Sequence, residues 1–103
     1  MKKMALFLVA VLMGCASTQN PQGSQEAIDA CAEVCLGALA NGTELSNGPC
    51  LSNQIVQDWV CDVAHSPRQA VDNEQANQCP WFREGKAHHF VELDPDCELI
   101  TVY

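Results

Sequence analysis

The chain has 103 residues, of which 48% are hydrophobic and 17% are charged, and its formal net charge at pH 7 is −8. This length is enough for one small domain and too short for two of ordinary size. A surface with such an acidic excess repels nucleic acid and anionic lipid headgroups, so we expect no nucleic-acid partner.

The first fourteen residues have the pattern of a secretory signal peptide. Lys2 and Lys3 give a positive start, residues 5–13 are all apolar, and Gly14 stands before Cys15. This order predicts an export signal, residues 1–14, that is removed from the mature protein. The apolar run is much shorter than the roughly 20 residues that a membrane-spanning helix needs.

The end of this segment, Leu12-Met13-Gly14-Cys15, resembles the lipobox of bacterial lipoproteins. The resemblance covers only the signal region, and it implies that Cys15 becomes the first residue of the mature chain and carries acyl chains such as palmitate. It therefore implies an extracytoplasmic protein attached to a membrane by a lipid anchor. In a double-membrane bacterium the default is the outer membrane, because Ala16 is not the aspartate associated with inner-membrane retention. Otherwise the place is the outer face of the cell membrane.

Residues 15–24 are predicted to form the lipidated N-terminus and a flexible tether, because they are polar and show no apolar periodicity. Residues 25–103 then form one small domain. A domain of this size rarely stands on its hydrophobic core alone. We therefore expect crosslinks to contribute much of its stability.

Cysteine parity supports those crosslinks. The chain has seven cysteines, and setting Cys15 aside leaves an even six: Cys31, Cys35, Cys50, Cys61, Cys79 and Cys97. In an oxidising compartment six cysteines predict three disulfides, each adding about 2–5 kcal/mol. Binding of zinc by the thiolates is disfavoured because no pair of closely spaced cysteine knuckles is present.

The clearest predicted element is a helix from Ser24, as its N-cap, to Asn41-Gly42, with Ile28, Cys31, Cys35 and Leu39 recurring at helical spacing. Cys31 and Cys35 lie one turn apart, which is poor geometry for a mutual bridge, so each is expected to bond a distant segment. The pairing among the six cysteines stays open.

The rest of the domain is predicted to be mainly strands and loops. Turn residues indicate a loop over 43–53, alternation indicates a half-buried strand over 58–65, and polar irregular sequence indicates a long loop over 68–85 that Cys79 holds in place. Residues 87–93 and 98–103 are predicted to form a hairpin. The fold class is α+β: one N-terminal helix packed on a small antiparallel sheet, disulfide-rich, with the helix cysteines tying the two layers.

The histidines are the strongest candidates for chemistry. An antiparallel arrangement places His65 near His88 and His89, of which only one can share its face. With Asp62 or Glu92 completing the site, imidazole and carboxylate ligands suit zinc or copper. This predicts an alternative function, a metal-binding or metal-sensing envelope lipoprotein. Without a metal no cofactor is expected.

No serine stands in a nucleophile-elbow motif, and no nucleophile is paired with a base in the sequence. We therefore expect no catalytic residues and no enzyme. The function that the sequence favours is a non-enzymatic binding or scaffolding module of the cell envelope, held at the membrane by lipid and engaging an envelope protein partner.

Overall fold

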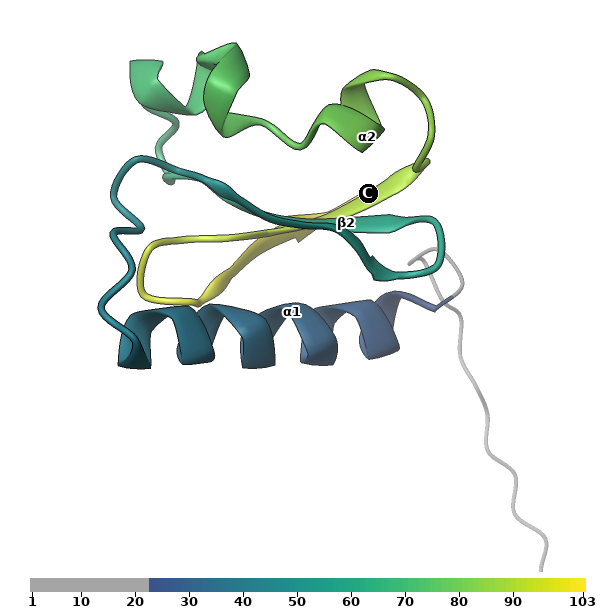
Figure 1. Cartoon of the computed structure of the whole chain (residues 1–103), viewed down its shortest axis with the longest axis horizontal. Coiled ribbons are helices and arrows are strands. Elements are labelled where there is room, and N and C mark those ends of the chain that lie inside the picture. Colours follow the sequence, from purple (N-terminus) through teal and green to yellow (C-terminus); the bar gives the residue numbers. More distant parts are fainter. Residues whose placement is uncertain (1–22) are drawn as a thin grey trace, which may run out of the picture.

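The computed structural model describes residues 23–103. The predicted signal peptide, Cys15 and most of the predicted tether lie outside the described residues. One long helix packs on one face of a four-stranded sheet, and the segment between the second and third strands covers the other face (Figure 1). In chain order the elements are α1 (Ser24–Ala40), β1 (Cys50–Val56), β2 (Trp59–Val63), η1 (Ala70–Asn73), η2 (Gln75–Asn77), α2 (Pro80–Arg83), β3 (His89–Leu93) and β4 (Leu99–Val102).

The strands lie side by side in the order β1-β2-β3-β4, and the sheet is mixed. β1 pairs with β2, and β3 with β4, in antiparallel fashion, whereas β2 and β3 run parallel. The α+β class, the single main helix and the disulfide-rich character are confirmed. The sheet is not antiparallel throughout, because residues 64–88 form a crossover long enough to bring the chain back to the same end of the sheet.

α1 forms largely as its sequence predicts. Asn41 caps its C-terminus, and Gly42 follows with φ of 78°. At the other end Gly23 is the N-cap with φ of 83°, so Ser24 is the first helical residue and lies buried. Ala27, Cys31 and Cys35 are fully buried against the sheet, while Leu39 at the edge of the predicted stripe remains 42% exposed. No helix of the described residues is long and apolar enough to cross a membrane.

Two further predictions can be compared with the structure. The hairpin of β3 and β4 is confirmed, with Asp94 N donating to Glu98 O at 2.8 Å across the turn. The loop predicted over 43–53 is too long, because β1 begins at Cys50. β1 is an edge strand whose pairing to β2 is irregular. The centre of its sequence is polar, so it lacks the alternation of apolar and polar residues by which a strand is predicted.

Three disulfides join the elements, and they use all six cysteines of the described residues: Cys31–Cys61, Cys35–Cys97 and Cys50–Cys79. The prediction of three bridges is confirmed, and so is the prediction that the two helix cysteines bond distant segments. The first two bridges tie α1 to β2 and to the β3–β4 turn. The third ties β1 to the crossover just before α2.

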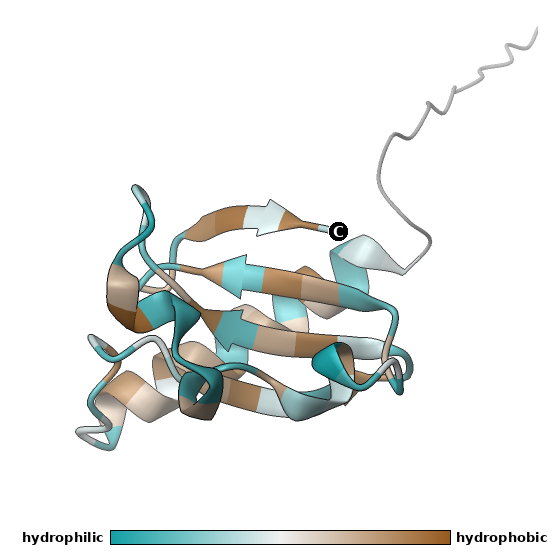
Figure 2. Cartoon of the chain, turned by 90° about the horizontal axis from the view of Figure 1, so that it is seen from above, coloured by the Kyte–Doolittle hydropathy of each residue, from teal (hydrophilic) through white to brown (hydrophobic). Residues whose placement is uncertain are grey.

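The sheet is covered on both faces, so β2 is more deeply buried than its sequence predicts. Trp59, Cys61 and Val63 face α1 and belong to the main core. Val60 packs instead with Cys79 and neighbouring aromatic rings on the crossover side. Figure 2 shows the strands seen from this second side, with the crossover lying over them.

Candidate functional site

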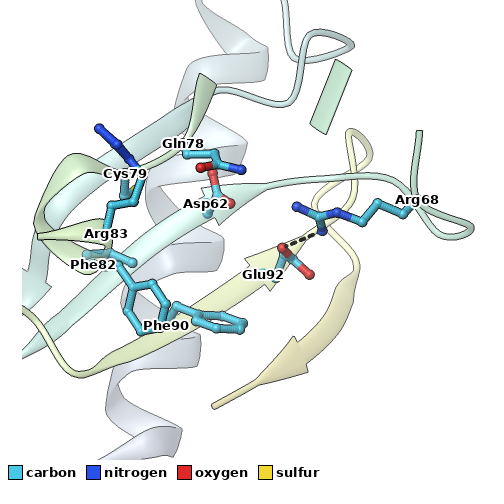
Figure 3. A pocket seen from close by; sticks show the side chains of 9 residues that line it. Asp62, Arg68, Gln78, Cys79, Phe82, Arg83, Phe90 and Glu92 are labelled. Atoms are coloured by element: carbon cyan, nitrogen blue, oxygen red, sulfur yellow. Dashed lines mark hydrogen bonds and ion pairs between the residues drawn. The ribbon is translucent and has the colours of Figure 1, made fainter. Parts of the chain in front are cut away.

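A cavity of about 230 Å³ lies between the sheet and the crossover, on the face opposite α1 (Figure 3). We call it the sheet-face cavity. Its floor comes from the strands, and its cover comes from the crossover and α2. The floor residues are Val60, Asp62, Phe90 and Glu92, and the covering residues are Arg68, Gln78, Cys79, Phe82 and Arg83.

The floor is set by the register of the parallel strands. Val60 of β2 stands beside Phe90 of β3, and two residues further on Asp62 stands beside Glu92. Side chains two residues apart share a face of a strand, so all four point into the same space. The cavity thus has an apolar half and a half that holds two carboxyl groups.

Asp62 is the unusual residue of this floor. Its Oδ1 is buried and has no hydrogen-bond partner in the structure. Burial raises the pKa of Asp62 to about 8, and the neighbouring negative charge of Glu92 adds to the shift. A buried acceptor without a donor is costly to leave unsatisfied, so Asp62 is the least stabilised polar group of the cavity.

Glu92, in contrast, has a counterion. Arg68 Nη1 lies 3.3 Å from Glu92 Oε2, and the other nitrogens of the same guanidinium donate to Asn73 Oδ1 at 2.8 Å and to Asp72 O at 3.2 Å. These three contacts hold the guanidinium of Arg68 beside Glu92. Asp62 forms no ion pair with any described residue, although the positive charge of Arg68 offsets part of the rise in its pKa.

Aromatic rings and a disulfide shape the rest of the cavity. Phe82 packs edge-on against Phe90, with 5.0 Å between the ring centroids. α2 begins with Pro80 at its first turn, directly after Cys79, whose bridge to Cys50 holds this end of the crossover on the sheet. The guanidinium of Arg83 points away from the two carboxyl groups (Figure 3).

The predicted ligand His65 belongs to a different cluster. Its Nδ1 lies 2.9 Å from Asp72 Oδ1, and Asp72 Oδ2 accepts from the backbone N–H groups of His65 and Gln69, each at 2.9 Å. Asp72 is only 3% exposed, and its Oδ1 would lie 2.6 Å from a Cβ added to Gly48. Burial pushes the pKa of Asp72 upward, but the hydrogen bonds from Gln69 and His65 outweigh it and hold the pKa below its ordinary value. These contacts anchor the start of the crossover.

His88 and His89 both contact the carboxylate of Asp58, the residue directly before β2. Asp58 lies in the β1–β2 turn and has a φ of 75°. Its Oδ1 is 2.7 Å from His88 Nδ1, and its Oδ2 is 3.6 Å from His89 Nε2. The hydrogen bond from His88 lowers the pKa of Asp58. The ring of His89 also stacks on Trp59, with 4.8 Å between centroids.

The structure does not bring His65 to the other two histidines. His89 pairs with Trp59 at the start of β2, whereas His65 follows the end of that strand, six residues or about 20 Å along. The expected proximity required antiparallel strands, and these strands are parallel. Within residues 23–103 no group of three or more histidine, cysteine or acidic residues is arranged to hold a metal ion. Zinc or copper binding by these histidines stays a prediction from the sequence.

The sheet-face cavity itself was missed by reasoning from the sequence, although a signal was present. Residues 59–64 read Trp-Val-Cys-Asp-Val-Ala, so Asp62 interrupts an apolar run that is typical of a strand buried on both faces. Interpreting the strand as half-buried placed Asp62 in solvent. A long connection to the next strand would have favoured the buried interpretation.

Comparison with known proteins returns no relative: no family model, no curated protein and no solved structure matches this chain. The function is therefore argued from the disulfides and from the chemistry of the sheet-face cavity.

Proposed function

We propose that the protein is an exported lipoprotein, attached to an extracytoplasmic membrane surface through Cys15, whose domain is a non-enzymatic binding module of the cell envelope. The observation that carries the proposal is the pairing of all six cysteines after Cys15 into three disulfides. Such a set supports an oxidising compartment. It also leaves Cys15 as the one cysteine of the sequence that these three disulfides do not use.

The binding role is supported by the sheet-face cavity. Its polar groups converge on a small volume with an aromatic wall, which is the usual composition of a small-molecule site. Cys79, the one cysteine that lines it, is bonded to Cys50 and is not a free nucleophile. The lining thus offers groups that hold a ligand, in a cavity made rigid by a covalent bridge.

Intact-mass measurement of the protein purified from its membrane, before and after reduction and alkylation, tests this proposal. The expected mass is that of a chain starting at Cys15 with covalent acyl groups, and alkylation should add six labels only after reduction. A matched Cys15→Ala variant should lack the acyl mass and keep the three disulfides. An unmodified Cys15 in the parent protein, or free thiols among the six, contradicts the proposal.

A further inference from the structure

We propose that the sheet-face cavity binds a small organic cation, a primary alkylammonium group held by the Asp62 carboxylate with its alkyl chain on Val60 and Phe90. The proposal rests on the binding function above and names the ligand class of that site. It starts from the Asp62 carboxyl group, which lines the cavity and whose buried Oδ1 accepts no hydrogen bond in the structure.

The charges around the cavity favour a cation. Glu92 is already paired with Arg68, and Arg68 is held by two further hydrogen bonds. Arg83 belongs to the lining, but its guanidinium points away from Asp62 (Figure 3). Asp72, which contributes a weaker negative field at Asp62, is bonded to His65. An ionised Asp62 therefore has only the charge of Arg68, which is engaged with Glu92, to balance it, and an ammonium group in the cavity supplies a direct partner.

The apolar half of the cavity suits an alkyl chain. Val60 is buried, and the Phe82 and Phe90 rings stand beside it in the lining. Phenyl rings also attract cations within about 6 Å of their centres. The long-range field acts in the same direction, since residues 15–103 contain thirteen acidic residues and three basic ones.

Binding is coupled to release of a proton. The pKa of about 8 means that Asp62 is mostly protonated at pH 7 when the cavity is empty. On binding, its carboxyl proton passes to buffer, and the carboxylate accepts a hydrogen bond from the ammonium N–H, which keeps its own charge. The apparent affinity then rises about 50-fold from pH 6 to pH 8, in proportion to the ionised fraction of Asp62.

Isothermal titration calorimetry of the full purified, oxidised protein in nonionic detergent tests this with butylammonium chloride. Butyrate and 1-butanol serve as anionic and neutral probes of similar size. Titrations at pH 7 in phosphate and in HEPES, which differ in ionisation enthalpy and contain no primary ammonium group, measure the proton count. We expect binding of butylammonium alone, release of about 0.9 proton per ligand, and the rise in affinity with pH.

Two variants separate local from long-range charge. Asp62→Asn keeps the shape of the side chain and should weaken butylammonium binding at pH 8 at least tenfold, with no proton release. Asp96→Asn removes one charge from an exposed turn position and should bind like the parent protein. Since Asp62 is mostly protonated at pH 7, asparagine replaces one neutral group by another of similar shape, and the variant should fold.

The results that overturn the ligand assignment are plain. They are absence of butylammonium binding at pH 8, equal binding of butyrate or butanol, and equal binding by the Asp62→Asn variant. If mass spectrometry finds an acylated Cys15 and three disulfides but one of these binding results is obtained, only the ligand class is wrong and the proposed function stands. If Cys15 carries no lipid but the protein still binds butylammonium, the proposed lipoprotein function is wrong and the ligand class stands.

Discussion

Replacing Asp62 by asparagine should stabilise the domain increasingly as pH rises. The pKa of Asp62 is raised from 3.8 to about 8 by burial and by Glu92. A carboxyl group with a raised pKa in the folded state contributes stability that is complete below pH 4 and is lost as pH rises through 8. Asparagine has nearly the same shape and does not titrate, so its variant lacks this loss.

The size of the effect follows from the shift. One pKa unit corresponds to about 1.4 kcal/mol, so the free energy of unfolding of the parent protein falls by up to about 5 kcal/mol across this window. That is an upper limit, because water that enters the sheet-face cavity solvates the ionised carboxylate. Between pH 5 and pH 8 the advantage of the variant should still grow by about 2 kcal/mol or more.

Guanidinium unfolding with the disulfides intact measures this, followed by the fluorescence of Trp59 and Trp81. Midpoints at pH 5 and pH 8 give the difference between variant and parent, provided that the slope against denaturant is unchanged. The control Asp96→Asn, at an exposed turn position, measures the effect of removing one acidic charge outside the cavity. If the curves of Asp62→Asn and the parent stay parallel from pH 5 to pH 8, Asp62 is not buried without a partner and the reasoning fails.

Two further predictions concern the crossover and its anchor. Asp72→Asn should destabilise the domain by about 1–3 kcal/mol, because it weakens hydrogen bonds to a buried carboxylate. Since the pKa of Asp72 is lowered, its contribution is present above pH 4 and is lost as pH falls, so acid unfolding of the variant should lose part of its pH dependence, as circular dichroism would report. Gly48→Ala should lower the free energy of unfolding by about 1–3 kcal/mol, because its Cβ would stand 2.6 Å from Asp72 Oδ1 at a φ of 68°. The matched Gly37→Ala, where nothing lies within 4 Å, should instead raise it by about 0.5–1 kcal/mol, and an equal effect of the two substitutions in denaturant unfolding would count against this explanation.

Local patterns predicted the elements that depend on local physics. The helix follows from an apolar stripe and a C-terminal Asn-Gly, and the β3–β4 hairpin follows from Asp94-Pro95 between two strand-like runs. The number of disulfides follows from parity. For the helix and the hairpin, neighbouring residues in the sequence carry the whole signal, whereas parity needs only a count of the cysteines.

What the sequence did not reveal depends on contacts between distant segments. The polar centre of β1 is tolerated because it lies at the sheet edge and is bonded to the crossover through Cys50–Cys79. The direction of β3 relative to β2 is set by the path of residues 64–88, which no periodicity describes. The sheet-face cavity forms where this crossover passes over the neighbouring residues Asp62 and Glu92 of the sheet. The sequence alone therefore could not predict which residues line it.

With the N-terminal attachment proposed above, the Cys31–Cys61 bridge has a mechanical consequence. Tension applied through the chain before Gly23 can unwind α1 only from Ser24 to the residue before Cys31, since the bridge then carries the load into β2 at the centre of the sheet. Stretching those first seven residues lengthens the chain by only about 13 Å. The rest of the fold, including the cavity on its opposite face, is thereby shielded from the pull.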